Sequence, residues 1–91
     1  MKYRSSIDII SVILDAANGG TDGLTKTKIT YQAYLSHEQI KEYLRLLTYN
    51  DLLRYDRQTH AFKTTEKGLR FLEIYNRMSD VTKTQRQHHL W

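Results

Sequence analysis

Residues 36–51 read SHEQIKEYLRLLTYND and carry the clearest helix signal in the chain. Apolar side chains recur there at the spacing of one helical face, at Ile40, Tyr43, Leu44 and Leu47. Ser36 can cap the first free amides, and Gln39 occupies the second position of a capping box. The opposite side is polar and carries His37, Glu38, Lys41, Glu42, Arg45 and Tyr49. We therefore predict a helix with one buried stripe and one face open to a partner.

Two further helices are predicted before this segment. Residues 6–18 have a broad apolar face, with Ser5 or Ser6 as the cap and Asp8 near the positive end of the helix dipole. A glycine-rich break covers residues 18–23, and a second helix follows from Thr25 to about residue 33, with residues 29, 33 and 34 facing inward. So few residues then remain before Ser36 that the two helices must cross steeply, as in a helix-turn-helix.

After residue 51 the spacing of the apolar residues changes from the period of a helix to the alternation of a strand. Residues 53–56 and 61–64 alternate between apolar and polar, which predicts a short two-stranded hairpin. Thr65 can cap a last helix that runs from residue 66 to about residue 81, and Gly68 in its first turn indicates close packing. This helix has two apolar stripes, one of which can dock on the first helix while the other needs a partner. We predict a dimer interface through Phe71, Ile74, Tyr75 and Met78, and the stripe of Leu69 and Leu72 is the alternative.

The composition limits the possible classes of protein. The 91 residues make one domain, predicted at residues 1–82 with a dimerisation helix at about 65–82 and a flexible tail at 83–91. No cysteine is present, and no apolar run approaches the roughly 18 residues of a membrane span. The net charge of +4 favours a polyanionic partner, and a cytoplasmic, nucleoid-associated location is expected.

Three runs resemble small archaeal winged-helix DNA-binding proteins. They are KITYQAYLS at residues 28–36, QIKEYLRLL at 39–47 and TTEKGL at 64–69, and the resemblance covers about residues 5–78. The chain departs from that family at Asp51, where glycine is common, and at Thr64, where an apolar residue is common. The resemblance implies a mainly α fold with a small β-hairpin, in the order helix, helix, helix, wing, helix. It also implies a homodimer through the last helix.

By the same resemblance, the third helix enters the major groove of double-stranded DNA and the wing lies over the adjacent backbone. The DNA-binding candidates are then Lys26, Lys28, Ser36, His37, Gln39, Lys41, Arg45, Arg57 and Lys63. Three alternatives are open for them. His37 can simply be a solvated surface histidine, which is the more common case. Gln39 can be used up in the capping box, and Glu38 and Glu42 can make the helix face a mixed-charge, solvated surface. Four tyrosines are expected to be core residues rather than stacking platforms for bases, namely Tyr31, Tyr43, Tyr55 and Tyr75.

The expected function is therefore sequence-specific DNA binding by a homodimeric transcriptional regulator. A protein-interaction module and a chromatin protein with little sequence preference are the alternatives. We predict no enzyme activity, because the chain has no cysteine nucleophile and no serine–histidine–acid set in a recognisable context. The histidines have no metal-ligand spacing, and we expect no metal, cofactor, membrane or small-molecule partner.

Overall fold

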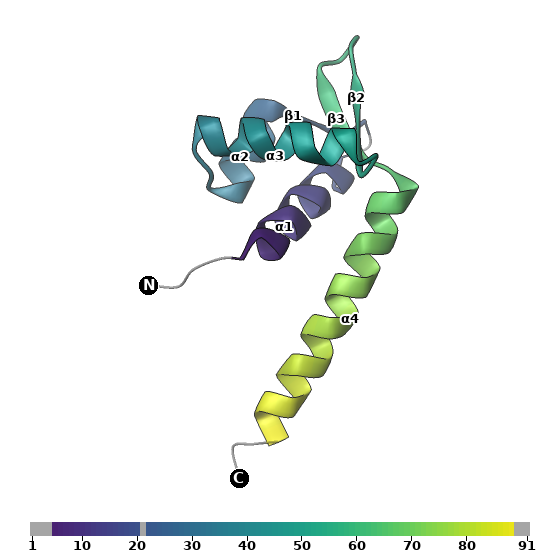
Figure 1. Ribbon diagram of the computed structural model, residues 1–91. Coiled ribbons are helices and arrows are strands. Elements are labelled where there is room, and N and C mark those ends of the chain that lie inside the picture. Colours follow the sequence, from purple (N-terminus) through teal and green to yellow (C-terminus); the bar gives the residue numbers. More distant parts are fainter. Residues whose placement is uncertain (1–4, 21, 89–91) are drawn as a thin grey trace.

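The computed structural model describes residues 5–20 and 22–88, which form a mainly helical fold with a small sheet. The elements follow in the order α1 (Ser6–Asn18), β1 (Leu24–Thr25), α2 (Lys26–Ala33), α3 (His37–Tyr49), β2 (Leu53–Asp56), β3 (Ala61–Thr64) and α4 (Glu66–His88). Helices α1 to α3 cluster beside the sheet, while α4 leaves the end of the wing and projects away from that cluster (Figure 1). The predicted order of helices and wing is confirmed.

Reciprocal hydrogen bonds define where two helices begin. The Ser36 hydroxyl accepts from the Gln39 amide at 3.2 Å, and the Gln39 side-chain oxygen accepts from the Ser36 amide at 3.1 Å. Ser5 and Asp8 exchange the same pair of bonds at the start of α1, at 3.1 and 3.3 Å. The predicted capping box of α3 is therefore present, and Ser5 rather than Ser6 caps α1.

The turn between α2 and α3 is short. Tyr34 makes it by adopting a left-handed backbone with φ 56°, which few residues other than glycine take. The prediction that Tyr34 faces inward is wrong, because the side chain leaves the buried face of α2 at this turn and is 86% exposed. Ile29 and Ala33 face inward as predicted, since both are fully buried.

The wing consists of β2 and β3, and the short strand β1 extends it. All pairs are antiparallel, with β3 in the middle of the sheet. The predicted hairpin is confirmed, but β1 was not predicted, because two residues are too few to show alternation. Gly23 leads into β1 with φ 87°, and a Cβ there would lie 2.4 Å from the Phe62 carbonyl oxygen. The close approach of these two segments therefore depends on glycine.

The core lies where α1 meets the other elements. Ile13, Leu14 and Ala17 of α1 are fully buried. Side chains from each neighbouring element join them in one cluster, including Ile29, Ala33, Ile40, Leu44, Leu47, Leu53 and Leu72. The apolar faces predicted for α1 and α3 are the faces that this core buries.

Two threonines join the wing to the helices. Thr64 is buried, and its hydroxyl donates to the Leu14 carbonyl oxygen of α1 at 2.6 Å. The Thr65 hydroxyl donates to the Asp51 carbonyl oxygen at 2.6 Å and accepts from the Gly68 amide at 3.0 Å. Thr65 therefore caps α4, as predicted, and also holds the turn that follows α3.

Gly68 lies where the first turn of α4 meets that junction. A Cβ at this position would lie 2.4 Å from the Leu52 carbonyl oxygen and 2.7 Å from the Thr64 Cγ2. The close packing predicted from an early helical glycine is therefore present, and a backbone atom is the obstacle.

We expect Gly68→Ala to lower the free energy of unfolding by about 1–3 kcal/mol, because the added methyl group forces α4 away from the wing. Urea denaturation measures the change. Gly19→Ala is the matched control, since its φ is −75° and a Cβ there would make an ordinary contact of 3.4 Å. That control should change stability by less than about 1 kcal/mol. Equal stability of the two variants would contradict the packing argument.

Helix α4 is longer than the sequence predicts. It ends at His88 rather than near Val81, because no glycine or proline follows Gly68 to stop it. Residues 83–88 therefore continue the helix, while residues 89–91 lie outside the described residues, and a flexible tail stays a prediction. No described helix is both long and apolar enough to cross a membrane.

Tyr75 joins α4 to the first turn of α1. Its hydroxyl donates to Oδ1 of Asp8, whose Oδ2 accepts from the Ser5 amide. The hydrogen bond to this carboxylate raises the pKa of the Tyr75 hydroxyl, because only the neutral hydroxyl can donate. One carboxylate thus caps α1 and positions α4.

We expect Tyr75→Phe to lower the free energy of unfolding at pH 7 by about 1–2 kcal/mol, through loss of this hydrogen bond. Folding raises the pKa of Tyr75 above the value near 10 of an unfolded tyrosine. The hydrogen bond therefore contributes its full stability below about pH 10, and this stability is lost as the pH rises through the raised pKa. Urea unfolding from pH 7 to 11 should give wild-type and variant curves that converge at the alkaline end. Tyr31→Phe, at an exposed position, is the control. A constant difference between the wild type and Tyr75→Phe would refute the assignment.

Candidate nucleic-acid interface

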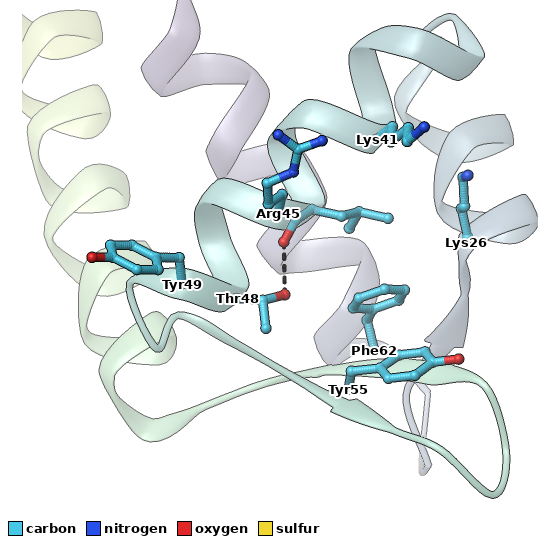
Figure 2. A pocket seen from close by; sticks show the side chains of 8 residues that line it. Lys26, Lys41, Arg45, Thr48, Tyr49, Tyr55 and Phe62 are labelled. Carbon is cyan, nitrogen blue, oxygen red and sulfur yellow. Dashed lines mark hydrogen bonds between the residues drawn. The ribbon is translucent and has the colours of Figure 1, made fainter.

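An open groove of about 520 Å³ separates α3 from the wing. Figure 2 shows its two walls, with Lys41, Arg45 and Thr48 on α3 and the rings of Tyr55 and Phe62 on the wing. Three further side chains complete the lining, Lys26 from the start of α2 and Leu44 and Tyr49 from α3. The groove therefore has aromatic rings on the wing side and three cationic residues on the helical side, and its accessible lining is mostly apolar.

The strand register decides which wing residues line this groove. Tyr55 pairs with Phe62, and Arg54 pairs with Lys63. Successive strand residues point to opposite faces of a sheet, so Tyr55 and Phe62 face α3 while Arg54 and Lys63 face away. The two rings touch, with centroids 4.8 Å apart and a tilt of 44°. The Tyr55 hydroxyl also lies 2.9 Å from Nδ1 of His60, so the ring is held at both ends.

The cations on α3 have no acidic partner among the described residues. Lys41 and Arg45 are exposed and form no ion pair, although Glu38 and Glu42 lie within helical contact distance in the sequence. Glu42 lines a second hollow, between α3 and the start of α1, and Arg45 lines that hollow as well without forming an ion pair with Glu42. Helical ion pairs therefore do not neutralise the side of α3 that faces the wing.

The residues predicted at the start of α3 are exposed, but two of them have a structural role. Ser36 and Gln39 hold each other in the capping box, which was one of the alternatives for Gln39. The side-chain oxygen of Gln39 is used there, so its amide nitrogen is the part left to donate to a ligand. His37 is exposed beside them.

Three predicted cations lie outside the groove. Lys28 is exposed on α2, and Arg57 is exposed in the turn of the wing. Lys63 lies on the outer face of the wing, where it lines a shallow hollow with Asp22 and Asp56. The structure thus brings Lys26, Lys41 and Arg45 together and spreads the other three predicted cations over the surrounding surface.

Tyrosines contribute more surface to this region than predicted. The expectation that Tyr31 and Tyr55 are core residues is wrong, since they are 82% and 40% exposed. Tyr43 and Tyr75 are half-buried. Tyr49 is 88% exposed at the end of α3, and its position four residues after Arg45 was the sequence signal that places both on one face. The alternation of apolar and polar residues correctly put Tyr55 on the same face of the wing as the buried Leu53. Tyr55 is nevertheless partly exposed, because this part of the wing extends beyond the core.

The residues predicted for a dimer interface divide into two pairs. Phe71 packs against the core and Tyr75 bonds to α1, so both are half-buried. Ile74 and Met78 lie one helical turn apart on α4 and are 59% and 66% exposed. An apolar strip is therefore open on this helix, and its use as a dimer contact stays a prediction.

A protein-family model described as winged helix-turn-helix matches residues 3–83 of the chain. The match extends from the start of α1 through the wing and into most of α4. No curated protein matches the chain.

Proposed function

Because the chain belongs to the winged helix-turn-helix family, which suggests DNA binding, we propose that it is a homodimeric transcriptional regulator that binds double-stranded DNA at specific sequences. In this proposal it works in the cytoplasm, on the chromosome. The observation that carries the proposal is the grouping of Lys26, Lys41 and Arg45 in one open groove beside α3. Cations without acidic partners can neutralise phosphates, and this neutralisation supplies most of the affinity of a protein for DNA.

Helix α3 would dock in the major groove with its exposed polar side toward the bases. Lys41 and Arg45 can reach guanine or a phosphate, and His37 can bond to a base edge. Lys26 and Lys28 lie in the first turn of α2, where Thr25 caps the Lys28 amide and the positive end of the helix dipole also favours a phosphate. Arg57 and Lys63 are the candidates for backbone contacts from the wing.

The acids of α3 support sequence selectivity. Glu38 and Glu42 are exposed beside the cations and have no ion-pair partner among the described residues. A carboxylate can accept a hydrogen bond from a cytosine amino group, whereas acceptor atoms of other bases repel it. A surface that only coats DNA would gain nothing from such groups.

Duplex binding should depend strongly on salt. If Lys26, Lys28, Lys41, Arg45, Arg57 and Lys63 each contact a phosphate, log K should fall with log salt at a slope of about −5 per subunit. Lys41→Gln and Arg45→Gln should each weaken binding and reduce the slope by about 0.9 per subunit. Fluorescence anisotropy with a duplex selected from a random library measures both quantities.

Arg70→Gln is the charge-matched control, because Arg70 is exposed on α4 and does not line the groove. It should leave the slope unchanged. A flat salt dependence in the wild type, or equal losses in all three variants, would contradict the proposed surface. Failure of the library to yield any preferred sequence would leave duplex binding in place and refute sequence specificity.

The open apolar strip on α4 supports the homodimer. Ile74 and Met78 expose large side chains on a helix that projects from the domain (Figure 1). A small domain buries a limited fraction of its surface, so pairing of this strip with a second copy would add stability. The recognition helices of such a dimer should lie about 34 Å apart to read a symmetric site.

We expect Ile74→Glu and Met78→Glu each to convert the dimer to a monomer, because a dimer seam would bury the new charge without a partner. Sedimentation velocity over a range of concentrations measures this. Leu69→Glu is the control, as it puts the same charge on an exposed apolar position of α4 outside the strip. A dimer that persists in both strip variants would show that the seam lies elsewhere.

A further inference from the structure

The groove between α3 and the wing has a feature that duplex binding does not require. Its wing side presents the rings of Tyr55 and Phe62, and Tyr49 of α3 contributes a third ring to the lining, apart from the other two (Figure 2). A closed duplex offers phosphates and base edges to a protein, while the faces of its bases are stacked on one another. Aromatic faces in a basic groove are instead the features that hold unstacked bases.

We propose that this groove binds an unpaired nucleotide, so that the protein also binds single-stranded nucleic acid. The base would stack on Tyr55, and its phosphates would lie against the cations of the opposite wall. This inference uses cations that the proposed duplex binding also uses, but it does not require that the protein binds duplex DNA.

The aromatic wall is rigid enough to serve as a platform. Tyr55 is 40% exposed, so part of its ring is open to the groove. The centroid of the Tyr55 ring lies 4.8 Å from the centroid of the Phe62 ring, and the Tyr55 hydroxyl lies 2.9 Å from Nδ1 of His60. A platform held in place in this way loses little conformational entropy when a base stacks on it.

The groove offers positive charge beside a mostly apolar lining. Lys26, Lys41 and Arg45 line the groove together, and no acidic residue lines it. Its volume of about 520 Å³ lies within the range of roughly 300–1,000 Å³ that is usual for small-molecule sites. An occupant therefore needs one flat aromatic part and one anionic part, and a nucleotide of an unpaired strand has both.

Tyr49 gives a second, independent contact. It is 88% exposed and comes from α3 rather than from the wing. Its removal would therefore leave the packing of Tyr55, Phe62 and His60 intact. A substitution at this position tests stacking without disturbing the wing.

The test uses the full chain and anisotropy of labelled dT12, rU12 and a mixed-sequence duplex of equal length. The wild type should bind at least one of the two single strands, and the comparison of dT12 with rU12 tells whether DNA or RNA is preferred. Tyr55→Leu and Tyr49→Leu keep an apolar side chain but remove the ring. Each should weaken single-strand binding by roughly 5- to 150-fold, the range for loss of one stacked base.

Tyr31→Leu is the matched control, since Tyr31 is 82% exposed on α2 and does not line the groove. This variant should bind the single strands and the duplex with the same affinities as the wild type. A central 2-aminopurine in the single strand should lose fluorescence on binding to the wild type, as stacking quenches it, and keep its fluorescence with Tyr55→Leu.

The inference is overturned if the wild type binds neither single strand, or if both leucine variants bind single strands as tightly as Tyr31→Leu does. It is also overturned if the leucine variants weaken duplex and single-strand binding by the same factor. Duplex binding without single-strand binding would refute this inference alone. Single-strand binding without duplex binding would refute the proposed function and leave this inference standing.

Discussion

The hydrogen bond from the buried Thr64 hydroxyl to the Leu14 carbonyl oxygen is the contact on which the interface geometry depends. It ties the end of β3 to the central helix of the core. Thr65, the next residue, ties the same point to the turn after α3 and starts α4. The wing, the turn that ends α3 and the start of α4 therefore meet at one dipeptide, which helps to hold the wing beside α3. An apolar residue at position 64 would fill the space but would not make this bond.

Most of the fold could be predicted because local signals and the buried pattern agree. The capping box at Ser36, the apolar stripe from Ile40 to Leu47 and the early glycine of α4 each have a physical meaning that the structure bears out. The errors lie where such signals are absent. Strand β1 is too short to show a period, and α4 continues to His88 because nothing in its sequence stops it. The Tyr34 side chain is exposed because its backbone adopts a left-handed conformation, which the helix propensity of tyrosine does not indicate.

The candidate site was predictable in part, residue by residue. Periodicity alone placed Lys41, Arg45 and Tyr49 on one side of α3. It could not show that Lys26 joins them from another helix, or that Lys63 lies on the outer face of the wing beside two acids, because both depend on how elements pack. The ionic partners of a cation are likewise a tertiary property. Arg45 lines both the groove beside the wing and the hollow that Glu42 lines, whereas Lys41 lines only the groove, and periodicity alone does not indicate this difference.

The two oxygens of Asp8 perform separate tasks, one at the start of α1 and one on the Tyr75 hydroxyl. A single carboxylate thus fixes the orientation of the projecting helix α4 relative to α1. In a dimer joined along α4, a small rotation of α4 about its contact with Asp8 would produce a larger displacement of α3. If the protein acts as such a dimer on DNA, the spacing of its two α3 helices would depend in part on Asp8, whose carboxylate oxygens are both engaged within the subunit.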